Sequence, residues 1–362
     1  MSEATVGTAR SAGTRWRMRR LADASGRFAM VAVDQRPPIE QVVRAARGED
    51  THRRDDVSAV KRLLIEELGG LSTAVLADPL IAYPDAVDAL PTDRGLIVTL
   101  EHAVYDEGPG GRRSEVIPDW TVEKIARMGG DGVKVLAWYR PDASAEVREH
   151  QERFVAEIGA ACRRHDLPFV FELLVYPFSA GTGTGDSYAE DSGKRAEAVI
   201  ESVERFAAPE FHVDLFKLES PVPAAELPDP DGPGADAVQA HFDALDRAAG
   251  RPWVMLSAGA TQDAFRHVLT YAYRAGASGF LAGRAIWWDA VQHFPDIEAC
   301  RSALRADGRP YLAELVAKTA AEARPWTEHP GAGPDPLVPD HAGPDFARDY
   351  PGHPGHPSEV SA

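Results

Sequence analysis

The stretch HVDLFKLESP, residues 212–221, places a lysine inside a run of apolar residues. Near-continuous apolar runs of this length are typical of strands that are buried on both faces, as in a parallel β-sheet. Burying the ammonium group of Lys217 without a partner costs several kcal/mol or forces the group to lose its proton. The stretch therefore predicts a buried parallel strand whose lysine belongs to an ion-pair network or is chemically reactive.

Seven other short runs are also rich in apolar and β-branched residues. They are RFAMVAV (27–33), STAVLA (72–77), GLIVTL (95–100), DGVKVLA (131–137), PFVFELLV (168–175), PWVML (252–256) and SGFLAG (278–283). Segments with helical spacing lie between most of them. Eight strands that alternate with helices predict an α/β fold, a (β/α)8 TIM barrel. A doubly wound open sheet is the alternative, but no GxGxxG motif follows the first strand.

The chain of 362 residues divides into three expected parts. Residues 1–20 form an N-terminal extension, residues 21–324 form a single TIM-barrel domain, and residues 325–362 form a tail. Barrels of this kind reach ~250 residues as one domain, so the length does not require a second one. The tail is rich in proline, glycine and histidine. We expect it to be mostly disordered and to contribute little to the core.

The composition excludes several kinds of partner. The formal net charge is −17, whereas nucleic acids and anionic membranes need a basic surface, so we expect neither as a partner. The two cysteines, Cys162 and Cys300, form no CxxC pair, which indicates a reducing cytoplasm. The sequence contains neither an HExxH motif nor a cluster of histidines and cysteines, so it does not indicate a zinc site. We therefore expect a cytoplasmic protein without a metal or another cofactor.

Polar residues occur where each predicted strand ends, which is where TIM barrels carry their functional groups. They are Asp34, Asp78, Glu101, Lys134, Glu172, Lys217, Ser257 and Arg284. We interpret Asp78 as the cap of a turn and Glu101 as the partner of a loop arginine. The other side chains are expected to converge on one small mouth.

This convergence predicts amine chemistry. A lysine that is buried beside a second cation tends to become a neutral amine, which attacks a carbonyl and forms a Schiff base. Lys217 is the expected nucleophile and Lys134 the neighbouring cation. Glu172 is expected to shuttle protons during iminium formation and bond cleavage, and Asp34 to hold the amine or a substrate hydroxyl. A buried ion-pair network that only stabilises the barrel is the alternative.

The last two strands add the signal of a phosphate site. LSAGATQD (256–263) and LAGRAIW (281–287) each place small residues and a glycine between a strand and a helix. Backbone N–H groups at such a helix start bind anions. We expect Ser257, Gly259, Gly283 and Arg284 to bind a phosphate group there.

Six segments together resemble a known family. FAMVAVDQR, IPDWTVEKIARMGGDGVKVL, FELLVY, DLFKLESPV, WVMLSAGAT and GASGFLAGRAIW resemble, in order from about residue 20 to 320, the class I tagatose 1,6-bisphosphate aldolases and the related sulfofructosephosphate aldolases. The resemblance implies a metal-independent Schiff-base aldolase that cleaves a ketose phosphate to dihydroxyacetone phosphate and an aldehyde. It implies the Schiff base on Lys217, with Asp34, Lys134 and Glu172 beside it. It also implies phosphate binding by Ser257 and Arg284.

The resemblance leaves two substrates open, tagatose 1,6-bisphosphate and sulfofructose phosphate. Arg140, in the segment WYRPD, resembles the sequence of the sulfofructosephosphate enzymes at this position. Tyr176 differs from them, because an arginine is expected there in those enzymes. Arg36, Arg112, Arg113 and Arg140 are the candidates for the far end of the substrate, and several arginines favour a second anion there. A transaldolase and a catalytically idle sugar-phosphate sensor remain alternatives. A homo-oligomer is also open, because barrel aldolases are often dimers or larger.

Overall fold

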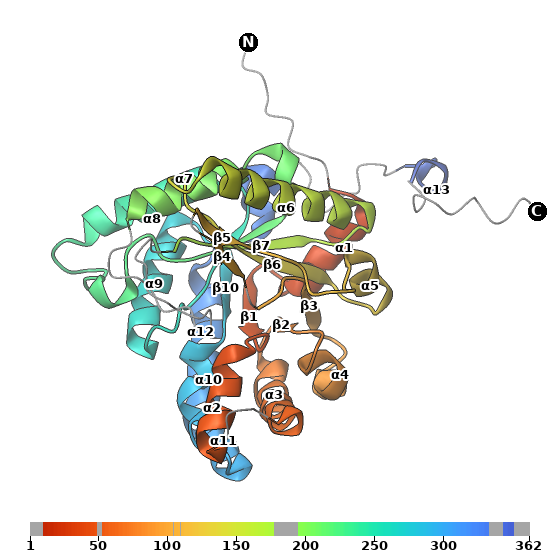
Figure 1. The fold of residues 1–362 in the computed structure, drawn as a ribbon. Helices are drawn as coiled ribbons and strands as arrows, with labels where there is room; N and C mark the ends of the chain where they lie inside the picture. Colours follow the sequence, from red (N-terminus) through yellow and green to blue (C-terminus); the bar gives the residue numbers. More distant parts are fainter. Residues whose placement is uncertain are drawn as a thin grey trace, which may run out of the picture.

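The eight predicted strands form a closed parallel barrel in the computed structural model of the chain (Figure 1). The structure describes residues 10–48, 53–103, 105–108, 110–176, 195–332 and 343–350. The barrel strands are β1 (Phe28–Ala32), β2 (Ala74–Ala77), β3 (Gly95–Thr99), β6 (Gly132–Trp138), β7 (Phe169–Leu174), β8 (Leu215–Leu218), β9 (Trp253–Met255) and β10 (Gly279–Ala282). Their order around the barrel is β1-β10-β9-β8-β7-β6-β3-β2. The predicted TIM barrel is confirmed.

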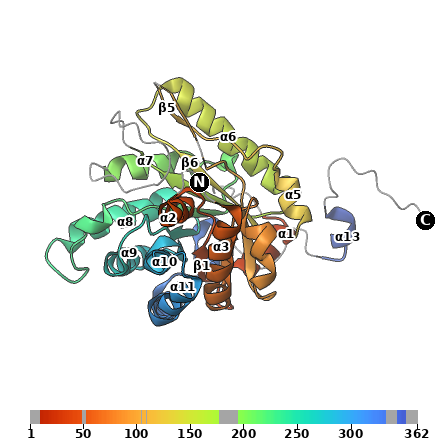
Figure 2. The same ribbon diagram turned by 60° about the horizontal axis from the view of Figure 1, so that its bottom comes forward.

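Helices surround the strands (Figure 2). They are α1 (Ala12–Leu21), α2 (Pro37–Arg47), α3 (Arg54–Leu68), α4 (Ala82–Ala86), α5 (Val122–Arg127), α6 (Ala145–Arg164), α7 (Ala196–Phe206), α8 (Ala235–Ala249), α9 (Gln262–Ala275), α10 (Arg284–Val291), α11 (Ile297–Ala303), α12 (Arg309–Glu322) and α13 (Phe346–Asp349). A π-helical turn, Leu304–Gly308, joins α11 to α12. A hairpin of β4 (Asp106–Gly108) and β5 (Gly111–Arg113) follows β3.

Short 3-10 turns complete the described secondary structure. They are η1 (Gly69–Leu71), η2 (Val87–Ala89), η3 (Pro209–Phe211), η4 (Ala224–Glu226), η6 (Trp326–Glu328) and η7 (Pro330–Ala332). Several helices begin and end as the sequence indicates. The side chain of Ser144 accepts a hydrogen bond from Val147 N at the start of α6, and Gly276 ends α9 in the left-handed conformation.

The two-residue period of the strands decides which side chains enter the barrel. In β8, Leu215 belongs to the inner apolar cluster, whereas Phe216 and Leu218 pack in the outer core between strands and helices. Lys217 lies two residues beyond Leu215 and therefore also points inward. The same alternation in β7 places Glu172 above Val170. The barrel interior is thus apolar at the N-terminal ends of the strands and ionic at their C-terminal ends.

Helix α1 closes the N-terminal end of the barrel. Its Met18 and Leu21 are fully buried in the inner apolar cluster, and Arg20 Nε lies 2.7 Å from Asp131 Oδ1. The predicted domain boundary at residue 21 is therefore wrong, because α1 packs as part of the barrel. Residues 1–9 of the expected extension lie outside the described residues.

The first residues of the expected tail also pack against the barrel. Trp326 is 1% exposed in the inner cluster, His329 is 3% exposed, and Trp326 N donates to Gly26 O at 2.8 Å. The guanidinium of Arg10 lies over the Trp326 ring, 5.8 Å from its centroid. The predicted boundary at residue 325 is therefore wrong. The composition disfavours regular helices and strands, but it permits the 3-10 turns that anchor these rings.

The remainder of the expected tail is described only in part. Residues 333–342 and 351–362 lie outside the described residues. Residues 343–350 include α13, and the hydroxyl of Tyr350 donates to Asp166 Oδ2 at 3.0 Å and accepts from Gly13 N at 3.0 Å.

Replacing Trp326 by alanine should lower the free energy of unfolding by about 3–5 kcal/mol, because it opens a cavity in a fully buried cluster. The measurement is chemical denaturation of the full chain. Trp16→Ala is the matched control, since Trp16 on α1 is 59% exposed and its loss should change little. Equal stability of the two variants would contradict the packing of Trp326.

The stability of the protein should fall as the pH drops from about 6.5 to about 4. Burial, together with the nearby Arg324 and Arg10, lowers the pKa of His329 from 6.5 to about 4. The unfolded chain then binds a proton in this range that the folded protein does not, so acid favours unfolding. The full effect is about 3 kcal/mol. His329→Gln should remove this component of the pH dependence, whereas His293→Gln, at an exposed position, should leave it unchanged.

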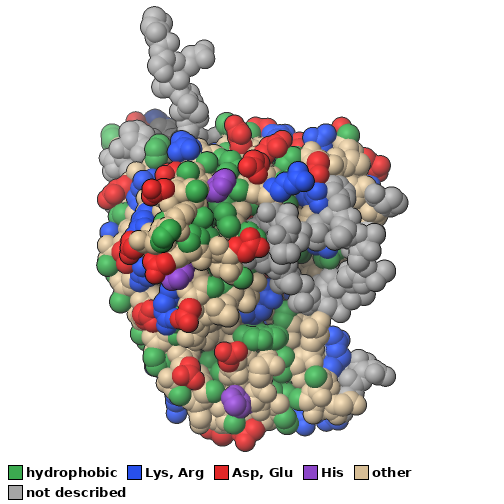
Figure 3. All heavy atoms as spheres, turned by 90° about the vertical axis from the view of Figure 1, so that its left-hand side faces the viewer, with side chains coloured by type: hydrophobic (Ala, Val, Ile, Leu, Met, Phe, Trp, Pro, Cys, Tyr) green, Lys and Arg blue, Asp and Glu red, His purple; other side chains and the backbone are tan. Residues whose placement is uncertain are grey.

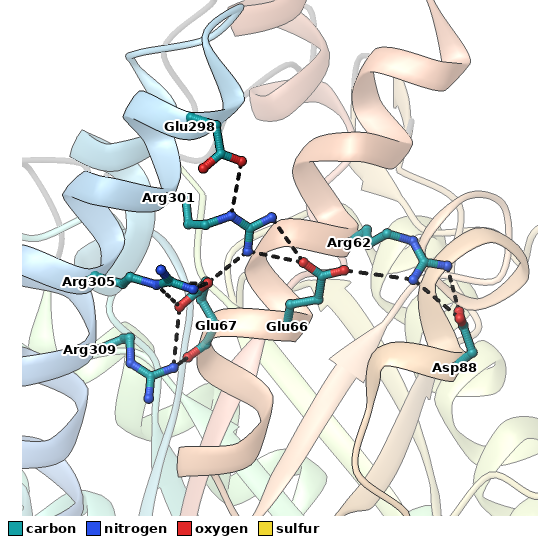
Figure 4. Close-up of polar contacts among 8 residues, drawn as sticks. All are labelled: Arg62, Glu66, Glu67, Asp88, Glu298, Arg301, Arg305 and Arg309. Atoms are coloured by element: carbon teal, nitrogen blue, oxygen red, sulfur yellow. Dashed lines mark hydrogen bonds and ion pairs between the residues drawn. The ribbon is translucent and has the colours of Figure 1, made fainter.

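An ion-pair network joins the start of the barrel to its end. Figure 4 shows Glu67 of α3 facing Arg301, Arg305 and Arg309, with distances of 2.8, 2.8 and 3.4 Å. Burial raises the pKa of Glu67, but the guanidinium groups of Arg305 and Arg301 outweigh it and hold the pKa below its ordinary value. Because β1 pairs with β10, this network stabilises the seam at which the barrel closes.

Charged side chains of both signs are mixed on one face of the described surface (Figure 3). Figure 3 shows the face that carries α8 and α9, on which acidic and basic side chains of the described residues are mixed with apolar ones. This face therefore offers no broad basic surface of the kind that nucleic acids bind. Among the described residues, no helix has both the length and the apolar character that crossing a membrane requires.

Candidate active site

A cavity of about 960 Å³, counting its open mouth, lies at the C-terminal ends of the barrel strands. Seven of the eight strand-end residues line it, together with Arg36 and Gly283; the seven are Asp34, Glu101, Lys134, Glu172, Lys217, Ser257 and Arg284. This is the end of the barrel at which TIM-barrel enzymes carry their active sites. The sequence therefore predicted both the end of the barrel and most of the groups that meet there.

Lys217 and Glu172 lie side by side at the bottom of the cavity. Their residues are register partners across β7 and β8, and both side chains point inward. Lys217 Nζ lies 2.9 Å from Glu172 Oε2, and only 3% of Lys217 is exposed. A buried amine in contact with a carboxylate has a partner to which it can give its proton.

Lys134 occupies the centre of a cluster of carboxylates. Its Nζ lies 3.0 Å from Asp34 Oδ2, 2.5 Å from Glu101 Oε1 and 2.7 Å from Glu172 Oε2. Burial would lower the pKa of Lys134, but these three carboxylates raise it well above the ordinary value. The cation expected beside Lys217 is therefore present, and Glu172 lies between the two ammonium groups.

Two of the carboxylates are held in the ionised form. Burial would raise the pKa of Asp34, but Lys134 and Lys217 lower it far below its usual range. The same two lysines outweigh burial at Glu172 and lower its pKa as well. Thr99 Oγ1 also donates to Asp34 Oδ2 at 2.9 Å. Both groups therefore carry a negative charge that stabilises the lysines.

Glu101 differs from the other two carboxylates. Burial raises the pKa of Glu101, and Lys134 offsets this effect only in part. The interpretation of Glu101 as the partner of a loop arginine is wrong for its carboxylate, which contacts Lys134. Within the described residues, it is the backbone carbonyl of Glu101 that accepts from an arginine, Arg36 Nη2, at 3.1 Å. Sequence reasoning named Glu101 but missed its contact with Lys134, because the approach of β3 to this lysine follows from the register of the barrel strands.

Asp78 lies apart from this cluster, as predicted. Its Oδ1 accepts hydrogen bonds from the N–H groups of Leu80 and Ile81 at 3.0 and 2.8 Å, which confirms the turn cap. The sequence did not indicate its second partner, Lys61 of α3, whose Nζ lies 2.5 Å from Asp78 Oδ2 in a fully buried ion pair.

The expected phosphate-binding residues come together after β9 and β10. Ala258 and Gly259 both adopt left-handed backbone angles, with φ of 49° and 79°, in the turn that Ala260 N closes onto Ser257 O at 2.7 Å. A Cβ atom on Gly259 would lie 3.4 Å from Arg284 Cζ, and one on Gly283 would lie 2.6 Å from Ala32 O. Glycine thus permits the left-handed turn beside Arg284 and the close approach of the start of α10 to β1.

Arg140 is paired with groups outside the cavity. Its guanidinium forms a bidentate pair with Asp142, at 2.9 and 2.7 Å, and donates to Tyr176 O at 2.9 Å. Arg140 is not one of the described residues that line the cavity. The short turn after β6 brings Asp142 within reach and directs the arginine away. Arg113 is also paired at the surface, 2.8 Å from Glu146.

Arg112 is instead held by three aromatic rings beside the cavity. Its Cζ lies 4.4, 4.6 and 4.9 Å from the ring centroids of Tyr105, Trp138 and Tyr176. Tyr105 and Trp138 line the cavity, whereas Arg112, like Arg140, is not one of the described lining residues and lies behind these two rings. In the strand order, β3 and β6 lie opposite β9 and β10, so this group faces the phosphate site across the barrel. Sequence reasoning named Arg112 but missed the three rings, which come from separate segments.

Comparison with known proteins places these features in a family. Tagatose 1,6-diphosphate aldolase of Listeria monocytogenes is 31% identical over 317 residues, which cover 85% of this chain and 92% of that protein. Tagatose 1,6-diphosphate aldolase 2 of Enterococcus faecalis is 30% identical over 326 residues, covering 87% of this chain and 96% of that protein.

Solved structures agree in fold. An archaeal fructose 1,6-bisphosphate aldolase matches with a TM-score of 0.53 at 18% identity, over 84% of this chain and 99% of that one. The fructose-bisphosphate aldolase of Plasmodium falciparum matches with a TM-score of 0.60 at 12% identity, over 86% and 95%. Residues 28–289 match the family model described as DeoC/LacD family aldolase. The chain is an aldolase, a carbon–carbon lyase, and belongs to the DeoC/LacD family.

Proposed function

We propose that the protein is a class I aldolase that cleaves a ketose phosphate through a Schiff base on Lys217. The observation that carries the proposal is the buried Lys217 amine, 2.9 Å from Glu172 Oε2, at the bottom of a cavity whose other end holds Ser257 and Arg284. Lys134 supplies the positive charge among the three carboxylates. Amine chemistry of this kind requires no metal ion.

The reaction begins at the ketone carbon of the substrate. The neutral amine of Lys217 attacks this carbon, Glu172 takes and returns the protons, and loss of water gives an iminium ion. The C4 hydroxyl then loses its proton, its oxygen becomes the carbonyl of the departing aldehyde, and the C3–C4 electron pair moves to the iminium nitrogen. The enamine takes a proton at C3, and water releases dihydroxyacetone phosphate.

A doubly anionic ketose fits the cavity best. Ser257, Gly283 and Arg284 form an anion site at one side, and Arg112 in its aromatic cage lies opposite. The relatives named tagatose 1,6-diphosphate aldolase support tagatose 1,6-bisphosphate as the first candidate. Sulfofructose phosphate is the second, because a guanidinium binds sulfonate and phosphate alike.

Product analysis with and without an added acceptor aldehyde tests this function. The proposed aldolase releases dihydroxyacetone phosphate from tagatose 1,6-bisphosphate without an acceptor. A transaldolase would need the acceptor, and an idle sensor would bind the sugar phosphate without turnover. Either of these two results would overturn the proposal.

Replacing Arg112 by alanine should lower kcat/KM for the doubly anionic ketose by roughly ten- to a hundredfold. The loss of one charged contact costs about 1.5–3 kcal/mol. Turnover of fructose 1-phosphate, which lacks the second anion, should change little. Arg113→Ala is the matched control, because its neighbouring guanidinium pairs with Glu146 at the surface. Equal losses on both substrates would show that Arg112 supports the fold instead of binding the far anion.

A further inference from the structure

The amide of Gln151 on α6 connects the hairpin after β3 to the end of β6. Gln151 is fully buried. Its Oε1 accepts a hydrogen bond from Ser114 N at 2.7 Å, and its Nε2 donates to Trp138 O at 2.6 Å and to Ser114 Oγ at 3.0 Å. Both hydrogens of the amide and its oxygen are therefore engaged, and they hold Ser114, the residue directly after β5, in place.

These partners leave the amide of Gln151 one orientation. Ser114 N can only donate and Trp138 O can only accept, so the amide oxygen faces the first and the NH2 group faces the second. The second hydrogen of Nε2 then points at Ser114 Oγ, which accepts it. Because the hydrogen between these two atoms comes from Gln151, the Ser114 hydroxyl keeps its own hydrogen, and it donates to no acceptor within the described residues.

The free side of this hydroxyl is the side of the cavity. Ser114 is buried against α6 by Gln151, and it lines the active-site cavity. Arg112, two residues earlier, lies behind the rings of Tyr105 and Trp138, whereas Ser114 forms part of the cavity wall itself. The cavity therefore receives an oriented hydrogen-bond donor from this segment.

Ser114 faces the half of the substrate that leaves as the aldehyde. The bridge between Glu101 and Val116 holds its segment beside the end of β3, and Gln151 connects it to the end of β6. These two strands lie across the barrel from β9 and β10, which carry the proposed phosphate site. With the ketone carbon bonded to Lys217 and its phosphate toward β9 and β10, the rest of the sugar extends toward β3 and β6.

We propose that Ser114, oriented by Gln151, donates a hydrogen bond to an oxygen of the aldehyde half of the substrate. The proposal rests on the proposed aldolase function and adds a specificity-determining residue to it. The acceptor is either an oxygen of the far phosphate or sulfonate, or a hydroxyl oxygen of the sugar chain. Gln151 is the positioning residue, since it acts only through Ser114.

Replacing Ser114 by alanine removes the hydroxyl and leaves the backbone contacts. The value of kcat/KM for cleavage of tagatose 1,6-bisphosphate should fall by roughly three- to thirtyfold, the scale of one hydrogen bond to a substrate oxygen. Exchange of the C3 hydrogen of dihydroxyacetone phosphate with solvent deuterium, followed by NMR, should change by less than about threefold. This exchange passes through the Schiff base and the enamine without the aldehyde half.

Fructose 1-phosphate distinguishes the two acceptors. If the acceptor is the far anion, Ser114→Ala should cleave this substrate as well as the unmodified enzyme does. If it is a sugar hydroxyl, the losses on the two substrates should be similar. Ser144→Ala is the matched control, because Ser144 caps the same helix and its N donates to Gly110 O of the same hairpin, but it is not one of the described groups that line the cavity.

The variant Gln151→Glu tests the orientation of the hydroxyl. A glutamate has at most one hydrogen to donate, which the nearer acceptor Trp138 O takes, so the Ser114 hydroxyl turns its hydrogen away from the cavity and toward the carboxyl group. Gln151→Glu should therefore lower kcat/KM as Ser114→Ala does, and the double variant should lose no more than either single one. Losses that multiply in the double variant would contradict the role of Gln151.

A loss of cleavage below about threefold in Ser114→Ala would overturn the proposal. An equal loss in the exchange reaction would also overturn it, because the substitution would then disturb the whole site instead of one contact to the aldehyde half. An unmodified enzyme that exchanges no hydrogen and forms no borohydride-reduced adduct would instead refute the Schiff-base function, so the two failures are distinguishable.

Discussion

Replacing Lys217 by alanine should abolish turnover, with kcat lower by roughly 10⁴- to 10⁶-fold, the scale seen when an enzyme loses its nucleophile. No other described amine takes its place, because Lys134 Nζ contacts three carboxylates that hold its proton. Lys217→Arg should be equally inactive, since a guanidinium stays protonated and cannot form the iminium. The measurement is release of dihydroxyacetone phosphate from tagatose 1,6-bisphosphate.

The matched control is Lys61→Ala. Lys61 is also fully buried and paired with an aspartate, but its side chain extends from α3 to Asp78 and is not one of the described groups that line the cavity. Its loss should destabilise the fold and leave the folded protein active at low temperature. If Lys217→Ala retained more than a hundredth of the unmodified kcat, Lys217 would not be the nucleophile.

Replacing Lys134 by methionine should have the second largest effect. The change leaves Asp34, Glu101 and Glu172 buried without the cation that they share. Removing one partner of a buried ionic group lowers the free energy of unfolding by about 3–5 kcal/mol. Turnover should also be lost, because Glu172 would no longer be held ionised beside Lys217.

The pH dependence of stability makes this prediction sharper. In the unmodified protein, Lys134 and Lys217 overcome burial and lower the pKa values of Asp34 and Glu172. These carboxylates therefore contribute stability above their ordinary pKa values, and the contribution is lost as the pH falls. Lys134→Met removes much of it, so the stability gap between the two proteins should narrow in acid. A gap that stays constant from pH ~5 down to pH ~2 would contradict this account.

The sequence predicted the barrel and the centre of its site because both follow from local patterns. The alternation in DLFKLE places Leu215 and Lys217 inside and Phe216 outside, and the same period directs Glu172 inward. Parallel strands then bring their C-terminal ends to one mouth. The contact between Glu172 and Lys217 then follows directly, because the two residues are register partners on the neighbouring strands β7 and β8.

The errors concern contacts between distant segments, which no local pattern encodes. Trp326 reaches the inner core through Gly26 and Arg10, and composition alone gave no sign of these partners. The pairing of Arg140 with Asp142 in the turn after β6 was likewise not apparent from the sequence. The position of Arg112 depends on three rings from separate segments, and the contact of Glu101 with Lys134 depends on how neighbouring strands pair.

Borohydride trapping tests the central claim most directly. The enzyme is incubated with dihydroxyacetone phosphate, reduced with borohydride and digested, and the modified peptide is identified by mass spectrometry. We predict one reduced triose-phosphate adduct, on the peptide that contains Lys217, and none on that peptide when substrate is omitted. An adduct on Lys134 alone, or no adduct in an enzyme that cleaves its substrate, would contradict the Schiff base on Lys217.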